Sequence, residues 1–106
     1  MKSILYINKK DKNKIIKVKS VAFLNRIRIE STDEGEASLL PDDAEMLIMK
    51  GMARNEMEKF LSDLRKKSIS IALKCVETET NRDWSLQKLY EEIKKEHESI
   101  EKIRTD

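Results

Sequence analysis

The chain has 106 residues, of which 39% are hydrophobic and 40% charged, and its formal net charge at pH 7 is +2. This length suits one domain with a modest core, and the single Cys excludes an internal disulfide. No apolar run approaches the roughly 18 residues of a membrane-spanning helix, and no cationic leader followed by an apolar segment opens the chain, so we expect a cytoplasmic protein.

The small net charge conceals a gradient along the chain. Residues 1–30 contain nine Lys or Arg and two acidic residues, whereas residues 31–63 contain three basic and nine acidic residues. Such a chain either pairs the two regions internally or presents a basic and an acidic patch to different partners. Both interpretations stay open from the sequence.

The first part of the chain predicts short β-strands. Residues 4–7 form a β-prone apolar run, and residues 15–19 alternate apolar and cationic side chains after a polar, turn-rich segment. This pattern predicts a hairpin. Residues 21–29 and 36–40 predict two more strands, separated by a turn. We therefore expect a small antiparallel sheet of three or four strands.

A short helix is predicted over residues 41–50. Pro41 suits a first helical position, and the acidic residues that follow it favour the positive end of the helix dipole. Gly51 can end the helix in the left-handed conformation. The residues expected to define this joint between the two halves of the chain are Leu40, Pro41, Ala44, Leu47, Ile48 and Gly51.

The remainder of the chain predicts two or three helices. Apolar residues recur at helical spacing from Met57 to Cys75 and again from Leu86 to Ile103, with a polar connection between the two stretches. Two such helices joined by a short loop are expected to pack as an antiparallel pair.

These elements predict an α+β fold with two subdomains. A small, basic, β-rich subdomain over residues 1–54 is closed by the short helix over 41–50, and a helical subdomain covers residues 55–106. No internal repeat is visible in the sequence. The two subdomains are expected to pack tightly, because no flexible linker separates them.

Residues suited to catalysis or to metal binding do not cluster in the sequence. The only Cys and the only His, Cys75 and His97, lie on different predicted helices, which excludes a zinc site within one chain. Gly35 and Gly51 stand alone, so no glycine-rich phosphate loop is present. We expect no enzyme activity, no catalytic residue, no metal and no cofactor.

Nucleic-acid binding is one candidate function of the basic front part. Cationic side chains along a hairpin can contact phosphates, with an affinity that falls as the salt concentration rises. The alternative is a solvated face whose lysines protect an exposed edge strand. The candidate contacts are Lys9, Lys10, Lys12, Lys14, Lys17, Lys19, Arg26 and Arg28.

Residues 37–54 combine a short strand, Leu-Pro, an acidic helix start and a Lys-Gly-Met-Ala turn. This segment resembles the end of the small β domain of archaeal GINS subunits, which belong to a replication complex. The resemblance implies a non-catalytic scaffold that assembles with a second GINS subunit. Such a scaffold would link the replicative helicase to a RecJ-like protein and primase.

The resemblance also implies an oligomer formed mainly through the helical domains, with intramolecular core packing as the alternative role for the same side chains. The implied interface residues are Leu86, Leu89, Tyr90, Ile93 and Ile100. A second hypothesis is a small viral or phage-type protein that associates with DNA, or with a host protein, through the basic hairpin. Protein partners are expected in either case, and no membrane is involved.

Overall fold

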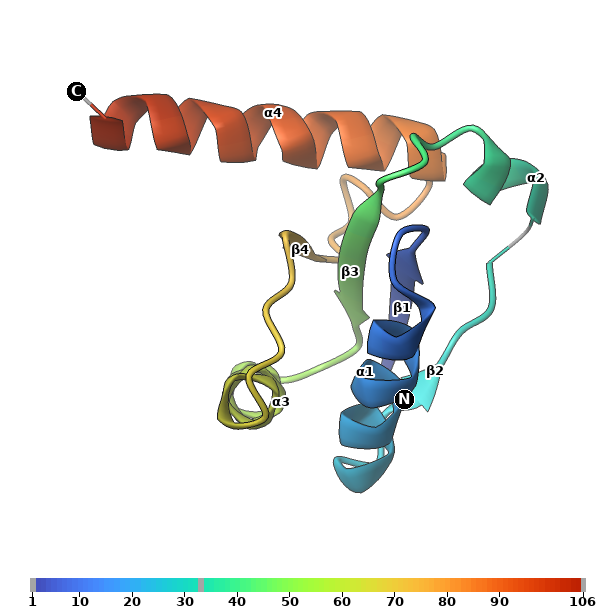
Figure 1. The fold of residues 1–106 in the computed structure, drawn as a ribbon, viewed down its shortest axis with the longest axis vertical. Helices are drawn as coiled ribbons and strands as arrows, with labels where there is room; N and C mark the ends of the chain where they lie inside the picture. Colours follow the sequence, from blue (N-terminus) through green and yellow to red (C-terminus); the bar gives the residue numbers. More distant parts are fainter. Residues whose placement is uncertain (1, 33, 106) are drawn as a thin grey trace.

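The computed structural model describes the backbone of residues 2–32 and 34–105, and the side chains of these residues as far as residue 98. In chain order the elements are β1 (Ser3–Asn8), α1 (Lys12–Leu24), β2 (Arg28–Ile29), α2 (Glu34–Ser38), β3 (Glu45–Lys50), α3 (Arg54–Lys66), β4 (Leu73–Val76) and α4 (Leu86–Thr105). The predicted α+β class is confirmed (Figure 1).

The four strands form one sheet in the order β2-β1-β3-β4. The two central strands, β1 and β3, are antiparallel, whereas each edge strand is parallel to its central neighbour. The sheet is therefore mixed and not purely antiparallel as predicted. Two parallel strands cannot be joined by a hairpin turn and need a longer crossover connection, which a helix supplies in each unit. Helix α1 supplies the crossover from β1 to β2, and α3 supplies the one from β3 to β4.

Two similar βαβ units build this sheet, although the sequence shows no visible repeat. The first strand and the helix of the second unit begin 42 positions after their counterparts, Glu45 after Ser3 and Arg54 after Lys12. The central strands pair from Ser3 opposite Lys50 to Asn8 opposite Glu45. If each residue is replaced by its equivalent in the other unit, 42 positions away, the first pair becomes the last and the register is unchanged. An approximate two-fold axis therefore relates the two units.

The C-termini of α1 and α3 share the same local geometry. Arg26 and Ser68 both take a left-handed backbone conformation, with φ of 58° and 60°. One residue later, the Ile27 amide donates to the Ala22 carbonyl and the Ile69 amide donates to the Leu64 carbonyl, each at 2.9 Å. This is the hydrogen-bond pattern of a Schellman helix end, and it turns the chain back towards the edge strand in both units.

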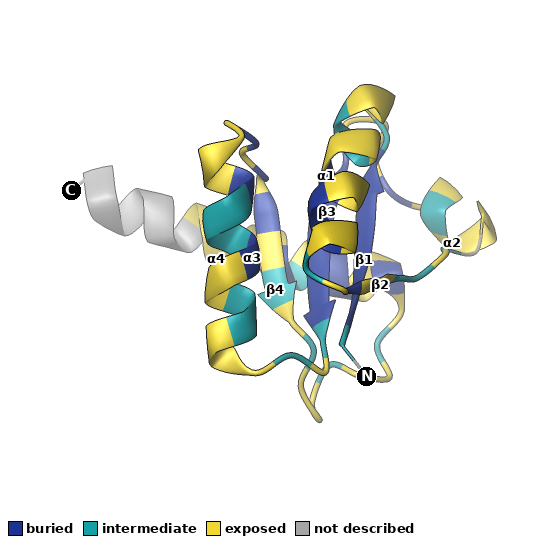
Figure 2. Cartoon of the chain, turned by 90° about the horizontal axis from the view of Figure 1, so that it is seen from below, coloured by how far each residue is buried: buried dark blue, intermediate teal, exposed yellow. Residues whose placement is uncertain are grey.

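Helices cover both faces of the sheet. On one face, α1 and α3 bury Val18, Phe60 and Leu64 against β1 and β3. On the other face, α4 buries Leu89 and Tyr90. Figure 1 shows α4 on the opposite side of the strands from α1 and α3, and Figure 2 shows the two central strands as the most buried part of the molecule.

The predicted helix over residues 41–50 is wrong, because residues 45–50 form β3. Its four central residues, Met46 to Met49, are at most 4% exposed. A continuous apolar run is typical of a strand that is covered on both faces, and both faces of this sheet carry helices. Pro41 starts a turn closed by a hydrogen bond from the Ala44 amide, and Gly51, with φ of 62°, ends a strand and not a helix.

The predicted hairpin is also wrong, because residues 12–24 form α1. Asp11 caps this helix: its side-chain oxygen accepts a hydrogen bond from the Lys14 amide at 3.1 Å. The buried side chains Val18, Val21 and Ala22 follow helical spacing, so a period of 3.6 explains the segment better than the alternation expected of a strand. Similarly, the strand expected over 36–40 is replaced by α2 and the turn that follows it.

Residues 55–106 do not form the expected antiparallel pair of helices. Helices α3 and α4 lie on opposite faces of the sheet and belong to separate core clusters. Between them, β4 adds an edge strand beside β3. The sheet therefore includes strands from both sides of the boundary predicted at residue 54.

A polar network beside Glu45 connects three elements of the fold. The Glu45 carboxylate accepts hydrogen bonds from Tyr6 at 2.5 Å and from the Ala72 amide at 3.2 Å, and it pairs with the Lys14 ammonium at 2.7 Å. Burial opposes the charge of Glu45, but these three donors outweigh it and hold the pKa of Glu45 below its ordinary value. Burial, and then the bond to Glu45, raise the pKa of Tyr6, so its hydroxyl remains a donor.

The chain has two phenylalanines in opposite environments, which permits a matched test of the core. Phe60 is fully buried, whereas Phe23 is 79% exposed. We expect Phe60→Ala to lower the free energy of unfolding by about 3–5 kcal/mol because it leaves a cavity in the core. In the monomeric chain, Phe23→Ala is expected to change it by less than about 0.5 kcal/mol. Urea denaturation measures both, and equal losses would contradict the packing described above.

Glu45→Gln is expected to lower stability at neutral pH by about 1–3 kcal/mol, because the buried Tyr6 hydroxyl and the partly buried Lys14 ammonium lose a charged acceptor. The pKa of Glu45 is lowered in the folded state, so its contribution is present above the unfolded pKa and is lost as pH falls through the folded pKa. The free energies of unfolding of the wild type and the variant, measured by urea denaturation, should therefore become equal at acid pH. Glu58→Gln, on the exposed surface of α3, is the control, and a difference that persists undiminished in acid would refute this role of Glu45.

Candidate functional site

The outward side of α1 carries large apolar side chains. Ile16 is 64% exposed, Phe23 79% and Leu24 67%. They lie on the side of the helix opposite the buried Val18 and Ala22. Figure 2 shows the exposed side of α1 facing away from the sheet. Apolar side chains on two opposite sides of a helix are typical of a helix that is buried on both sides, by its own fold on one and by another surface on the other.

The second unit shows that the fold does not require this arrangement. The positions of α3 that correspond to Ile16, Phe23 and Leu24, 42 residues later, are Glu58, Arg65 and Lys66, all exposed. Two buried positions, in contrast, are apolar in both helices: Val18 corresponds to Phe60, and Ala22 to Leu64. The sheet therefore constrains the inner side of each helix alone, and the apolar outer side of α1 has no counterpart on α3.

Cationic side chains surround these apolar residues. Of the eight predicted nucleic-acid contacts, Lys10, Lys12, Lys17, Lys19, Arg26 and Arg28 are exposed, and none of them forms an ion pair with any side chain that the structure describes. Helix α1 itself contains no acidic residue. We call Ile16, Phe23 and Leu24, together with Lys12, Lys17 and Lys19, the α1 outer face.

The other two predicted contacts, Lys9 and Lys14, have structural partners. The Lys9 ammonium donates to the carbonyl oxygens of Ala37 and Leu40, at 3.1 and 2.9 Å, and so fixes the end of α2. The Lys14 ammonium pairs with Glu45. An ammonium group that already has a partner gains less from a phosphate, so these two lysines are weaker candidates for nucleic-acid contact than the six exposed cations.

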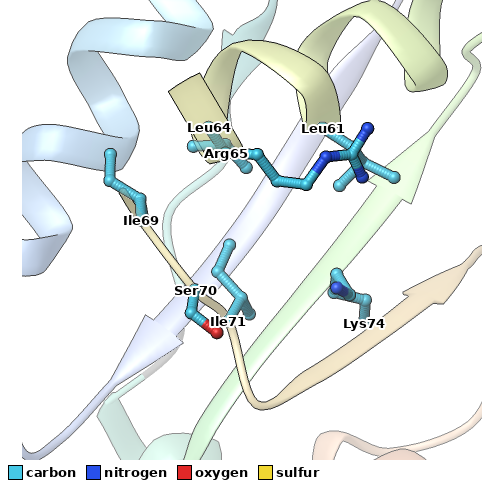
Figure 3. Close-up of a pocket in the computed structure, with 7 residues that line it drawn as sticks. All are labelled: Leu61, Leu64, Arg65, Ile69, Ser70, Ile71 and Lys74. Carbon is cyan, nitrogen blue, oxygen red and sulfur yellow. The ribbon is translucent and has the colours of Figure 1, made fainter. Parts of the chain in front are cut away.

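A hollow lies beside the helix of each unit, next to the edge strand in the first unit and next to the segment that leads to the edge strand in the second. In the first unit, Phe23, Leu24 and Ile29 line it together with Lys19. In the second unit, the floor is apolar and the rim carries Arg65 and Lys74 (Figure 3). The second hollow measures about 250 Å³. Pockets for small molecules usually measure about 300–1,000 Å³, so this hollow does not by itself indicate a ligand site.

The predicted interface residues of the last helix lie in the core. Leu86, Leu89, Tyr90 and Ile93 are at most 9% exposed because they pack on the sheet. They therefore correspond to the alternative of intramolecular packing and offer no surface to a partner. Ile100 lies outside the residues whose side chains are described. Of the predicted joint residues, Leu40, Ala44, Leu47 and Ile48 are buried, whereas Pro41 and Gly51 are exposed.

The residues described show little that points to reactive chemistry. Burial raises the pKa of the half-buried Cys75 to about 11, with smaller contributions from Glu96 and Glu77, so its thiol stays protonated at neutral pH. No three metal-binding side chains gather among the described residues. Within the same part of the chain, no helix has the length and apolar character needed to cross a membrane.

The basic residues of this region can be predicted from the sequence, but the exposure of its apolar residues was not predicted. A strand pattern over residues 15–19 and 21–29 predicts no shared outer surface for Ile16 and Leu24, whereas the helix α1 exposes both. The sequence feature that could have predicted this surface is Asp11, a residue suited to the N-cap of a helix. In a helix that starts there, Ile16 and Phe23 are seven residues apart and lie on the same side.

Comparisons with known proteins found a family but no individual relative. No curated protein and no solved structure matches the chain. A protein-family model described as a domain of unknown function (DUF3783) matches residues 45–100, which run from the first residue of β3 into α4. This match includes the whole second βαβ unit and covers more than half of the sequence, so the chain belongs to the DUF3783 family.

Proposed function

We propose that this protein is a non-catalytic binding protein that docks a protein partner on the α1 outer face. One observation carries the proposal: Ile16, Phe23 and Leu24 are exposed at positions where the equivalent helix of the same chain has Glu58, Arg65 and Lys66. Exposed apolar side chains lower solubility. Because the fold does not require them at these positions, their presence on one surface is best explained by an interface.

The composition of the face supports a partner of particular chemistry. Protein interfaces commonly have an aromatic or aliphatic centre with a polar rim, and aromatic anchors contribute much of the affinity. Phe23 would be the anchor here, with Ile16 and Leu24 beside it. Because the rim consists of Lys12, Lys17 and Lys19, the matching surface is apolar at its centre and acidic around it.

A GINS-like scaffold in DNA replication is a narrower form of this proposal. It comes from the resemblance over residues 37–54, but α2 and β3 stand where that resemblance expects a strand and a helix, so the local structure does not support it. The partner of such a scaffold would still need an exposed surface to dock on. The α1 outer face is a better candidate for this than the last helix, whose side chains from Leu86 to Ile93 serve the core.

Nucleic-acid binding is the second candidate function. The six exposed cations from Lys10 to Arg28 favour it, since unpaired Lys and Arg release counterions when they contact phosphates. Phosphates, however, leave Ile16 and Leu24 in water. A protein partner accounts for the charges and for the apolar side chains together, and we therefore place it first.

The direct test transplants the outer residues of α3 onto α1. The variant Ile16→Glu, Phe23→Arg, Leu24→Lys gives α1 the side chains that α3 tolerates, so we expect its melting temperature and circular dichroism to remain close to those of the wild type. Affinity purification from the source cells should then recover a protein partner with the wild type and lose it by about tenfold or more with the variant, because a buried anchor contributes about 2 kcal/mol.

The matched control changes the same positions of the second unit, as Glu58→Gln, Arg65→Gln and Lys66→Gln, and should keep the partner. A well-folded α1 variant that retains the partner as the wild type does would exclude this face as the docking site. Labelled DNA separates the second candidate. Binding to DNA that weakens steeply with salt, and that survives the apolar changes, would favour nucleic acid.

A further inference from the structure

The acidic counterpart of the α1 outer face lies on the same chain. Exposed acidic residues precede and follow the exposed Leu39, which is 60% accessible, along the segment from α2 to the start of β3. These residues are Glu34, Glu36, Asp42 and Asp43. None of the four forms an ion pair with a side chain that the structure describes. We call Glu34, Glu36, Leu39, Asp42 and Asp43 the α2 acidic segment.

One chain does not bring these two surfaces together. Helix α1 packs beside α3 on one face of the sheet, whereas α2 packs beside α4 on the other side. The ion pairs that do join the basic and acidic regions use different residues, such as Lys2 with Glu56 and Lys14 with Glu45. The charge gradient seen in the sequence therefore remains largely unpaired within the described part of one chain.

Both surfaces flank the same free edge of the sheet. Helix α1 leads into the edge strand β2, and α2 follows it. Figures 1 and 2 both show α2 on the β2 side of the molecule. Because the edge strand separates the basic and the acidic surface, a second molecule that approaches this edge can meet both of them.

We propose that the partner on the α1 outer face is a second copy of this chain, whose α2 acidic segment lies against it. This inference rests on the proposed function and names its partner. In a two-fold dimer the contact forms twice, with Leu39 of each copy meeting Phe23 and Leu24 of the other. The lysines then face the carboxylates, so charge and apolar character match on each side.

A second copy explains more than an anionic polymer does. DNA would neutralise Lys12, Lys17 and Lys19, but it would repel the nearby acidic segment and leave Phe23 exposed. The second copy pairs the cations, pairs the anions and covers the apolar side chains at the same time. The nearly balanced net charge of +2 also permits close approach of two identical chains.

A charge swap tests the pairing. The basic-face variant carries Lys12→Glu, Lys17→Glu and Lys19→Glu, and the acidic-segment variant carries Glu34→Lys, Glu36→Lys and Asp43→Lys. Sedimentation equilibrium should show a wild-type dimer that dissociates as salt rises. The dimer affinity of each variant alone should be lower by about tenfold or more, because like charges then face each other. An equimolar mixture of the two variants should recover the dimer. In one contact of the mixed dimer, acidic α1 meets basic α2, and in the other the unchanged basic α1 meets the unchanged acidic α2.

The control is Arg65→Glu with Lys66→Glu on the exposed surface of α3. It should dimerise as the wild type does, and circular dichroism should confirm that every variant is folded. A wild type that stays monomeric at low salt, or a mixture that fails to recover the dimer, would overturn the second-copy proposal. A monomer that nevertheless loses another protein partner in the Ile16→Glu, Phe23→Arg, Leu24→Lys variant would leave the docking face intact and exclude the second copy alone.

Discussion

The antiparallel pairing of β1 with β3 is the contact on which the other elements depend. All six residues of β1 are buried, and the four central residues of β3 are at most 4% exposed, because helices cover both faces of this pair. Each central strand then positions a helix and an edge strand of its own unit. If β1 and β3 did not pair in this register, α1, α3 and α4 would have no common surface to pack on.

The two-fold arrangement separates what the fold needs from what it leaves free. Equivalent helices share two buried positions, Val18 with Phe60 and Ala22 with Leu64, and both end in a left-handed residue, since both must return the chain to an edge strand. Their outer sides are under no such constraint. The difference between the α1 outer face and the charged outer side of α3 is therefore the feature of this chain that points most directly to an interaction.

The sequence predicted the long α4 and the apolar run of β1, because a helical period and a short continuous run are local signals. It did not distinguish β3 from a helix, since Pro41 and Gly51 are compatible with either and the deciding factor is coverage of both sheet faces by distant helices. The candidate site was predicted in part. Its cations stand out in any fold, whereas the exposure of Phe23 depends on α1 being a helix with one side against the sheet.

The central claim, that residues 45–50 pair with β1 and do not form a helix, is tested most directly by nuclear Overhauser effects on the labelled protein. The account predicts cross-strand contacts between the backbone protons of paired residues, such as Ile4 with Met49 and Tyr6 with Leu47. Strong sequential amide–amide contacts throughout residues 41–50, without cross-strand contacts, would show a helix there and contradict the sheet and the two-fold relation derived from it.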